Sequence, residues 1–311
     1  MATRVIGGYA KGCIAGAQAL PVTGPAWQVM RLSRNRNWGH PSLVRYIERL
    51  AVESKQNDGW PGLLVGDLSQ PRGGPMTFGH ASHQSGLDVD IWYNAMPDRE
   101  LSRKERDEIK LSSVLADPSH VDPDIWTTRH IDLIRRAASD GAVARVFVHP
   151  AIKKALCETV GSDRSFLKKV RPFWGHDDHF HVRLSCPVDS AECQRQSAVG
   201  SDDGCGRELD HWLRLVARPA TTAAPVPAVQ PPPQVQPVPA RQPQPGAAVA
   251  PVHPAPSYAT PPLPVGATPG VATYDSRATV QAPKGLDKLP AQCRVVLAAQ
   301  PTGDASQHDG H

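Results

Sequence analysis

The chain has 311 residues, a net charge of +4 and a pI near 8.8, a size that fits one large domain or two ordinary ones. Its basic residues form no block of the kind that binds nucleic acid, and no stretch reaches the roughly 20 apolar residues of a membrane helix. We therefore expect no nucleic-acid partner and no transmembrane segment, and the mild positive charge suits an anionic polymer or surface.

The composition divides the chain into three parts. Of its 32 prolines, 19 lie between Pro219 and Pro290, and Arg241 is the only Lys, Arg, Asp or Glu between residues 225 and 273. Such a tract cannot bury enough apolar surface to offset its ordering entropy, so we predict an extended or disordered tail over 218–290. Residues 1–217 then carry the fold, and residues 291–311 form a C-terminal segment.

Hydrophobic patterns predict alternating short helices and strands in residues 1–217. Apolar residues at helical spacing predict helices over 40–52, 125–138 and 165–170. Short apolar or alternating runs predict strands over 62–67, 87–92, 144–149 and 180–184. A loop rich in Gly, Pro and Ser covers 70–83, and no Rossmann or P-loop glycine motif follows any predicted strand. We predict an α+β fold with a small, mainly antiparallel sheet, flanking helices and long loops.

Six cysteines, none in a C-x-x-C pair, indicate disulfides rather than a structural zinc site: Cys13, Cys157, Cys186, Cys193, Cys205 and Cys293. An even number predicts three disulfides and an oxidising compartment, with six buried free thiols as the alternative. The sequence leaves the pairing open, although the seven-residue spacing of Cys186 and Cys193 makes them the easiest local pair.

Two histidine clusters lie beside carboxylates at strand starts. GHASHQSGLDVDIW contains His80 and His83, and WGHDDHFHVRL contains His176, His179 and His181. Because side chains two apart on a strand share a face, the two histidines of H-F-H point to one side.

In LDVDIW the same alternation separates Asp88 and Asp90 from their apolar neighbours. Gly86 gives the preceding loop the freedom to bring His83 back to Asp90. Two imidazoles, one carboxylate and an open position are typical of a catalytic zinc site, whereas calcium and magnesium prefer oxygen ligands. We therefore predict a zinc cleft on one face of the sheet.

GHASHQSGLDVDIW together with HDDHFHVRLSCP resembles the penicillin-insensitive murein endopeptidases. These belong to a wider group with lysostaphin-type peptidases, D-alanyl-D-alanine metallopeptidases and hedgehog-like domains. The group shares an H-x(6)-D segment, here His83 to Asp90, and a later H-x-H, here His179 to His181. The resemblance covers roughly 12–212 and reaches again to Cys293. It implies a zinc peptidase that hydrolyses D-alanyl–meso-diaminopimelyl cross-links in peptidoglycan by a metal-activated water.

The resemblance also implies roles for individual residues. It makes His83, Asp90 and His181 zinc ligands, with His80 as a further ligand. It makes His179 the general base or the residue that stabilises the transition state, with His176 beside it as a second catalytic residue. Asp117 and His120, in the segment DPSH, match a second metal site of the family.

The cysteines match the family in position as well. The resemblance implies the pairs Cys157–Cys205, Cys186–Cys193 and Cys13–Cys293, the last of which ties the C-terminal segment back to the N-terminus. Family members carry an export sequence ahead of the region that matches Gly12 and Cys13. No signal peptide is visible in residues 1–13. We interpret the start of the chain as truncated or misassigned and expect a periplasmic protein.

Other functions remain open at this stage. A D,D- or L,D-carboxypeptidase of the same group would need a cation for the terminal carboxylate, and Arg72 or Arg183 could supply it. A non-catalytic zinc module that binds the cell wall is the second alternative. Ser165-Phe-Leu-Lys168 matches the S-x-x-K motif of serine enzymes that bind penicillin, but no K-T-G follows it.

Overall fold

The structure, a computed structural model, describes residues 2–217 and 286–299. Apart from its last few residues, the predicted proline-rich tail over 218–290 lies outside these ranges. Within them, no helix combines the length and the apolar composition needed to cross a membrane.

The first half of the chain is mostly short strands with one long helix: β1 (Arg4–Gly8), β2 (Lys11–Ala15), β3 (Gln18–Ala19), β4 (Thr23–Gly24), β5 (Trp27–Val29), η1 (Leu32–Arg34), β6 (Trp38–Gly39), α1 (Pro41–Asn57), β7 (Leu63–Val65), β8 (Asp88–Ala95), α2 (Arg103–Glu108), β9 (Leu115–Asp117) and β10 (His120–Val121). The second half alternates helices and strands: α3 (Thr128–Ser139), β11 (Val143–Val148), α4 (Pro150–Thr159), η2 (Ser165–Lys169), β12 (Val170–Pro172), β13 (His179–Leu184), α5 (Arg207–Val216), η3 (Leu286–Lys288) and α6 (Ala291–Ala298).

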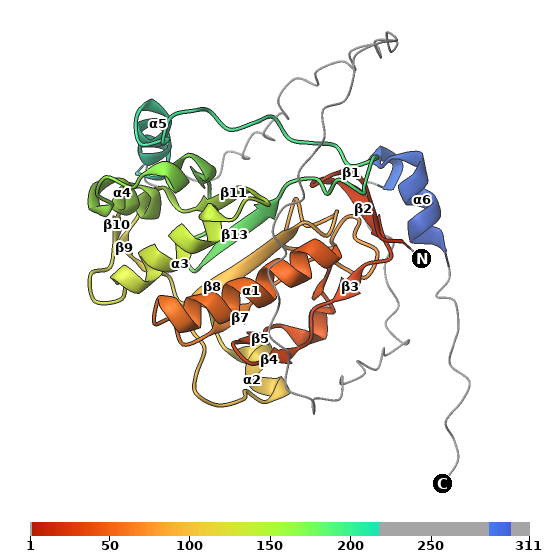
Figure 1. The fold of residues 1–311 in the computed structure, drawn as a ribbon, viewed down its shortest axis with the longest axis horizontal. Helices are drawn as coiled ribbons and strands as arrows, with labels where there is room; N and C mark the ends of the chain where they lie inside the picture. The colour runs from red at the N-terminus through yellow and green to blue at the C-terminus, as the bar shows by residue number, and fades with distance from the viewer. Residues whose placement is uncertain (1, 218–285, 300–311) are drawn as a thin grey trace, which may run out of the picture. The chain divides into compact units, whose positions relative to one another are not determined.

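A seven-stranded sheet in the order β12-β11-β13-β8-β7-β5-β4 lies at the centre of the described part. Its pairings are antiparallel except β11–β12 and β5–β7. The predicted α+β fold with a mainly antiparallel sheet is therefore confirmed. The central pair, β8 and β13, carries the aspartate and histidine motifs (Figure 1).

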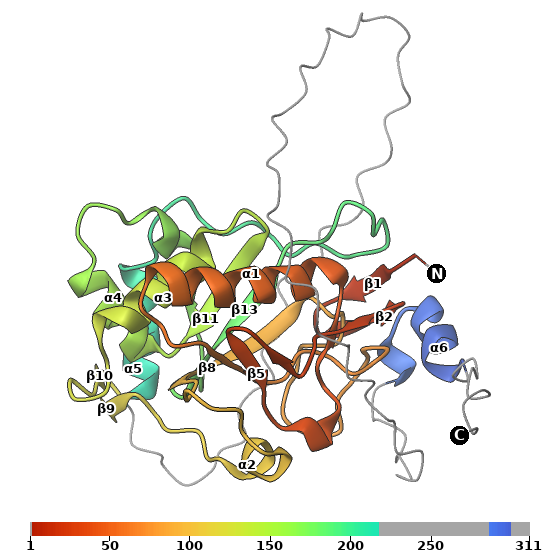
Figure 2. The same ribbon diagram turned by 60° about the horizontal axis from the view of Figure 1, so that its bottom comes forward.

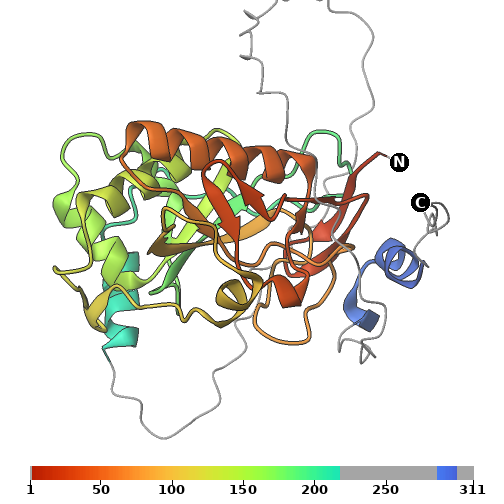
Figure 3. The same cartoon turned by 90° about the horizontal axis from the view of Figure 1, so that it is seen from below.

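One face of this sheet is covered by helices and the other holds the polar motifs. Val89, Ile91 and Tyr93 of β8 are buried in the main core with the apolar residues of α1 and α3. Figures 2 and 3 show α1 along one side of the sheet, and in Figure 3 α5 lies on the other side. Because neighbouring side chains alternate along a strand, Asp88 and Asp90 point away from this core.

Several predicted boundaries differ from the observed ones. The predicted helix over 125–138 begins only at Thr128, because Thr127 and His130 form a capping box and a turn precedes them. The helix over 40–52 starts as expected and continues to Asn57 through polar residues that form helix well without an apolar period. The segment 165–170 is a 3₁₀ helix followed by the short strand β12.

All three disulfides implied by the resemblance are present in the structure. Cys13–Cys293 joins β2 to α6, and around it Ile6 and Leu289 form a small separate core. Cys157–Cys205 joins α4 to the loop before α5, and the third bond closes a short loop after β13. The alternative of six free thiols was wrong.

Candidate metal centre

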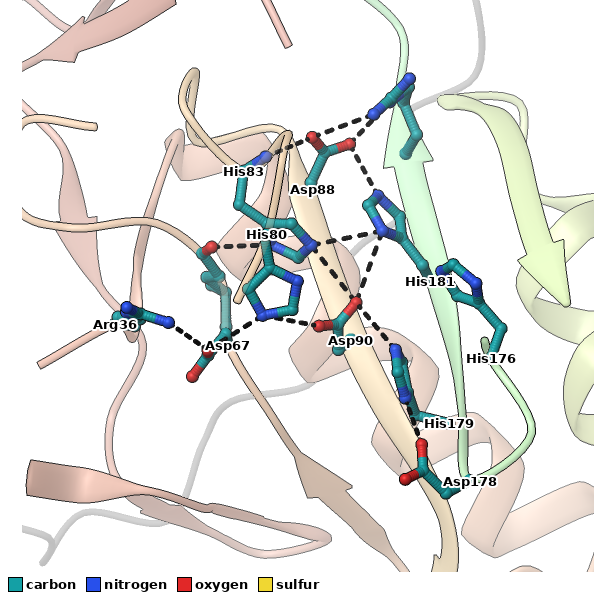
Figure 4. Close-up of polar contacts among 12 residues, drawn as sticks. Arg36, Asp67, His80, His83, Asp88, Asp90, His176, Asp178, His179 and His181 are labelled. Carbon is teal, nitrogen blue, oxygen red and sulfur yellow. Dashed lines mark hydrogen bonds and ion pairs between the residues drawn. The ribbon is translucent and has the colours of Figure 1, made fainter. Parts of the chain in front are cut away.

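The register between β8 and β13 assembles the polar face. His181 lies opposite Asp90, and Arg183 lies opposite Asp88. Residues that face each other in an antiparallel pair project to the same side of the sheet. His179, two residues before His181, projects there as well, so the two predicted motifs meet around the Asp90 carboxylate (Figure 4).

The loop before β8 brings His83 into this face. Gly86 adopts a left-handed backbone with φ of +70°, and a Cβ there would lie 2.7 Å from Cδ1 of Ile14. His83 is also left-handed, with φ of +64°, a conformation that costs free energy for a residue with a side chain. Its backbone N–H donates to Asp88 at 3.0 Å, and its Nδ1 donates to the Leu68 carbonyl at 2.8 Å. These contacts leave Nε2 of His83 directed at Asp90.

Three candidate ligand atoms form a nearly equilateral triangle. Nε2 of His83 lies 3.2 Å from Nδ1 of His181 and 3.3 Å from Oδ1 of Asp90, and the last two atoms are 3.5 Å apart. A tetrahedral zinc ion with bonds of 2.0–2.1 Å separates its ligand atoms by about 3.3–3.4 Å. Oδ1 of Asp90 is buried and accepts no hydrogen bond of good geometry from any described residue. The triangle therefore fits one face of a zinc tetrahedron and leaves a fourth position for water or substrate.

His80 lies on the other side of the Asp90 carboxylate. Its Nε2 is 3.5 Å from Oδ2 of Asp90 and 3.0 Å from Oδ2 of Asp67, and one ligand atom each of His80, His83 and Asp90 lie within 4.8 Å of one another. Burial alone would raise the pKa of Asp67, but hydrogen bonds from His80 and Arg36 lower it to about 2. His80 is thus held by an ionised carboxylate next to the Asp90 side chain.

Asp88 contacts His181 on the side of the ring that faces away from Asp90 and the triangle. It is fully buried, accepts a hydrogen bond from Nε of Arg183 at 2.7 Å and lies 3.0 Å from Nε2 of His181. A proton on Nε2 of His181 leaves Nδ1 with the lone pair that a metal ligand needs. The Arg183 cation and the neighbouring histidines outweigh burial and hold the pKa of Asp88 far below its ordinary value.

The pKa values of the two histidines in the triangle, His181 and His83, shift in opposite directions. Burial lowers the pKa of His181 to about 4 although Asp88 opposes it, so the ring is neutral at neutral pH. Burial also lowers the pKa of His83, but Asp90 and Asp88 outweigh it and raise the pKa to about 9. Since a ligating histidine must be neutral, a metal ion that binds here displaces the His83 proton.

His179 and His176 lie beside the triangle, with the ring centroid of His176 5.0 Å from that of His179 and 5.9 Å from that of His181. Nδ1 of His179 is 2.5 Å from Oδ1 of Asp178, and its Nε2 is 3.7 Å from Oδ1 of Asp90. Burial lowers the pKa of His179, but Asp90 and Asp178 outweigh it and raise it above its ordinary value. His176 has a left-handed backbone and donates from Nδ1 to the Trp174 carbonyl at 2.7 Å, and burial lowers its pKa to about 3.

The remaining predicted ligands lie on a hairpin. Asp117 and His120 contact each other at 3.0 Å across β9 and β10, and both side chains are more than half exposed. Two exposed ligands do not make a site by themselves, so the second metal site stays a prediction.

The supporting roles of three carboxylates were not predicted from the sequence. The alternation in LDVDIW had already placed Asp88 on the face of Asp90, but its contact with His181 depends on strand pairing. Asp178 directly precedes the H-x-H segment and could have been noticed there. Asp67 follows a different strand, β7, and no local pattern connects it to His80.

Comparisons with known proteins identify the family of this chain. Residues 5–298 match the family described as penicillin-insensitive murein endopeptidase. A protein of that name from Haemophilus influenzae is 46% identical over 219 residues, which cover 70% of this chain and 76% of that protein. Those from Klebsiella pneumoniae and Yersinia enterocolitica are 46% and 44% identical, covering 67% and 71% of this chain and 76% and 82% of the relatives. The chain belongs to the family of penicillin-insensitive murein endopeptidases.

Proposed function

We propose that this protein is a zinc-dependent murein endopeptidase that hydrolyses D-alanyl–meso-diaminopimelyl cross-links in peptidoglycan. The observation that carries the proposal is the triangle of His83, Asp90 and His181, with the buried Oδ1 of Asp90 left without a hydrogen bond. The names of its relatives support murein as the substrate.

The donor set favours zinc. Two imidazoles and one carboxylate suit zinc better than calcium or magnesium, and the fourth position stays open when His80 remains paired with Asp67. We therefore assign His83, Asp90 and His181 as ligands; His80 becomes a further ligand only when its Nε2 leaves Asp67. A zinc ion held there would supply Lewis-acid chemistry, polarising a carbonyl and acidifying a water molecule.

His179 is our candidate for proton transfer. Asp178 accepts from its Nδ1, which orients the ring and leaves Nε2 to take a proton from water and return it to the leaving amine. Its raised pKa favours the protonated form once the proton has been taken. His176 stays neutral, and because its Nδ1 donates to a backbone carbonyl, its Nε2 is an acceptor for a substrate N–H.

The alternatives find less support. Of the two candidate cations for a carboxypeptidase, Arg183 is buried against Asp88 and has no free charge to offer a terminal carboxylate, which leaves Arg72 alone for that role. Ser165 is exposed and donates its hydroxyl to Asp163, so the S-x-x-K match has no buried nucleophile. The pairing of His179 with Asp178 favours an enzyme over a non-catalytic zinc module.

Compartment and domain limits are part of the proposal. Three disulfides favour an oxidising compartment, and with a murein substrate this supports a periplasmic location. We propose residues 1–217 as the catalytic domain, with the C-terminal segment tied to it through Cys293.

The proposed function is tested by mass spectrometry of purified cross-linked muropeptide dimers incubated with the oxidised protein. We expect conversion to monomers that stops with a chelator and returns when zinc is restored. Cleavage that persists in the metal-free protein would refute the zinc mechanism. Cleavage of free pentapeptides but not of dimers would favour the carboxypeptidase.

A further inference from the structure

The face that holds the metal triangle continues beyond β13. Phe147 of β11 lies opposite His181, and Arg145 lies opposite Arg183. On the outer side of β11, Arg171 of β12 pairs with Phe147. The rings of Phe147 and His181 meet edge to face with centroids 5.2 Å apart. A row of side chains therefore leads from the triangle across two further strands.

This row forms the floor of a pocket with a volume of about 270 Å³. We call it the arginine pocket; its lining includes Arg145, Phe147, Arg171, Phe173, Glu208 and Trp212. Phe173, which is 38% exposed, packs against Trp212 of α5 on one side and against His176 on the other, with ring centroids 5.6 and 5.8 Å away. Phe173 thus connects the arginine pocket to His176, whose ring centroid lies 5.9 Å from that of His181.

One cation in this pocket has no acidic partner. Arg171, the other arginine of the lining, is paired with Glu208, and Arg183 on the neighbouring strand is paired with Asp88. The Arg145 guanidinium donates to the Ser197 carbonyl at 2.7 Å, and no carboxylate of the described residues lies within ion-pair distance of it. An arginine remains charged even when it is half buried, so the pocket presents an uncompensated positive charge.

In a second pocket that is rich in arginine, every arginine has an acidic partner. It has a volume of about 500 Å³, is lined by α1 and α3, and contains Arg49, Arg135 and Arg136. Each of these is paired with an aspartate: Asp140, Asp132 and Asp58, respectively. An arginine without an acid therefore distinguishes the pocket beside the metal centre.

We propose that the arginine pocket is a substrate subsite that binds a free carboxylate of the murein stem peptide, with Arg145 as the cation and Phe173 and Trp212 as apolar walls. The inference rests on the proposed function. Strands are about 4.8 Å apart, so the floor lies roughly 5–10 Å from His181. A stem peptide covers that distance in one to three residues, and diaminopimelate carries a carboxylate at each end of its carbon chain. Arginine binds a carboxylate through two parallel, charge-assisted hydrogen bonds. Arg145 would therefore favour stem peptides whose carboxylate is free over those in which it is amidated.

The test compares Arg145→Gln, Arg145→Lys and Arg49→Gln with the wild type, each as zinc-loaded, oxidised protein. Arg49→Gln is the matched control, because it removes the same charge from the other pocket. The substrates are cross-linked dimers with all free carboxylates intact, with those of the donor stem amidated, or with those of the acceptor stem amidated. On intact dimers we expect Arg145→Gln to raise KM about tenfold with little change in kcat, the loss typical of one charge-assisted hydrogen bond.

Amidation of the stem that Arg145 binds should raise the KM of the wild type and abolish the difference between it and Arg145→Gln, which identifies the donor or the acceptor as the source of the carboxylate. Arg145→Lys should recover part of the affinity, and Arg49→Gln should match the wild type. Equal KM values for Arg145→Gln and the wild type on intact dimers would overturn the subsite. The proposed endopeptidase function would not be affected by that result. An equal loss on intact and both amidated dimers would also overturn it, since that pattern marks a structural role.

A wild-type protein that cleaves none of the dimers would refute the proposed function instead. Calorimetric binding of the intact dimers then tests the subsite by itself. Weaker binding by Arg145→Gln supports the subsite, and equal binding rejects it.

Discussion

Replacing Asp88 with Asn tests whether the buried carboxylate beneath the triangle positions His181 for metal binding. The two side chains have nearly the same shape, so the change removes a charge without creating a cavity. Asp88 accepts from Nε and Nη2 of Arg183 and from the backbone of His83, and lies 3.0 Å from Nε2 of His181. The amide can replace one acceptor oxygen, but its NH₂ group must then face a donor.

Two effects of different size follow. The buried Arg183 loses its counter-charge, and breaking a buried pair in this way costs about 3–5 kcal/mol of unfolding free energy. His181 loses the carboxylate 3.0 Å from its Nε2, whose charge favours a proton on that nitrogen, and loss of such a partner typically weakens metal binding about 10–100-fold. We therefore expect a less stable protein whose zinc affinity falls by that factor.

Zinc affinity is measured by competition with a chromophoric chelator, and stability by urea unfolding of the metal-free protein. Asp58→Asn is the matched control, because Asp58 pairs with Arg136 through both oxygens far from the histidines. It should lower the stability and leave the zinc affinity unchanged. A folded Asp88→Asn protein with wild-type zinc affinity would refute a positioning role for Asp88.

Three further predictions concern other parts of the molecule. His179→Ala should keep zinc, measured by elemental analysis, while dimer cleavage falls about 10²–10⁴-fold; unchanged turnover contradicts its role. Replacing Cys157 and Cys205 together by Ser should lower the unfolding free energy in urea by about 4 kcal/mol for a loop of 48 residues, and an unchanged midpoint would show that the bond adds nothing. Burial and the nearby Arg171 lower the pKa of Lys153 to about 7, so the folded chain releases a proton that the unfolded chain keeps. The unfolding free energy of the wild type relative to Lys153→Met should therefore rise above pH 7 by up to about 1.4 kcal/mol per pH unit, and a constant difference would show that the folded lysine stays charged.

The local patterns of the sequence were sufficient to predict which residue types face the proposed site. Alternation in LDVDIW and FHVRL separates the apolar residues from the aspartates and histidines, because the side chains of a strand alternate whatever the strand pairs with. The residue types in the two clusters favour zinc for the same reason, since ligand chemistry belongs to each side chain. The cysteine pairs, in contrast, came from resemblance and not from local pattern.

Element boundaries were less well determined. Helix α1 runs past the last apolar position, and α3 starts later than its apolar period indicates. In both cases hydrogen bonding at the helix end decides the boundary, and periodicity carries no information about it.

Beyond the ligand set and the cysteine pairs that the resemblance implied, only the tertiary structure determined which residues meet. The register of β8 with β13 sets Asp90 opposite His181, and the left-handed residues His83 and Gly86 bring the loop back over the strand. Asp67 and Arg145 belong to strands or strand ends that are distant in sequence from the histidines. Contacts between such segments depend on strand order and on the packing of the whole sheet, and neither is encoded in any short stretch of the chain. The residue types of the proposed site and the strand faces that they occupy could thus be predicted from the sequence, whereas the supporting carboxylates and the adjoining pocket could be identified only from the fold.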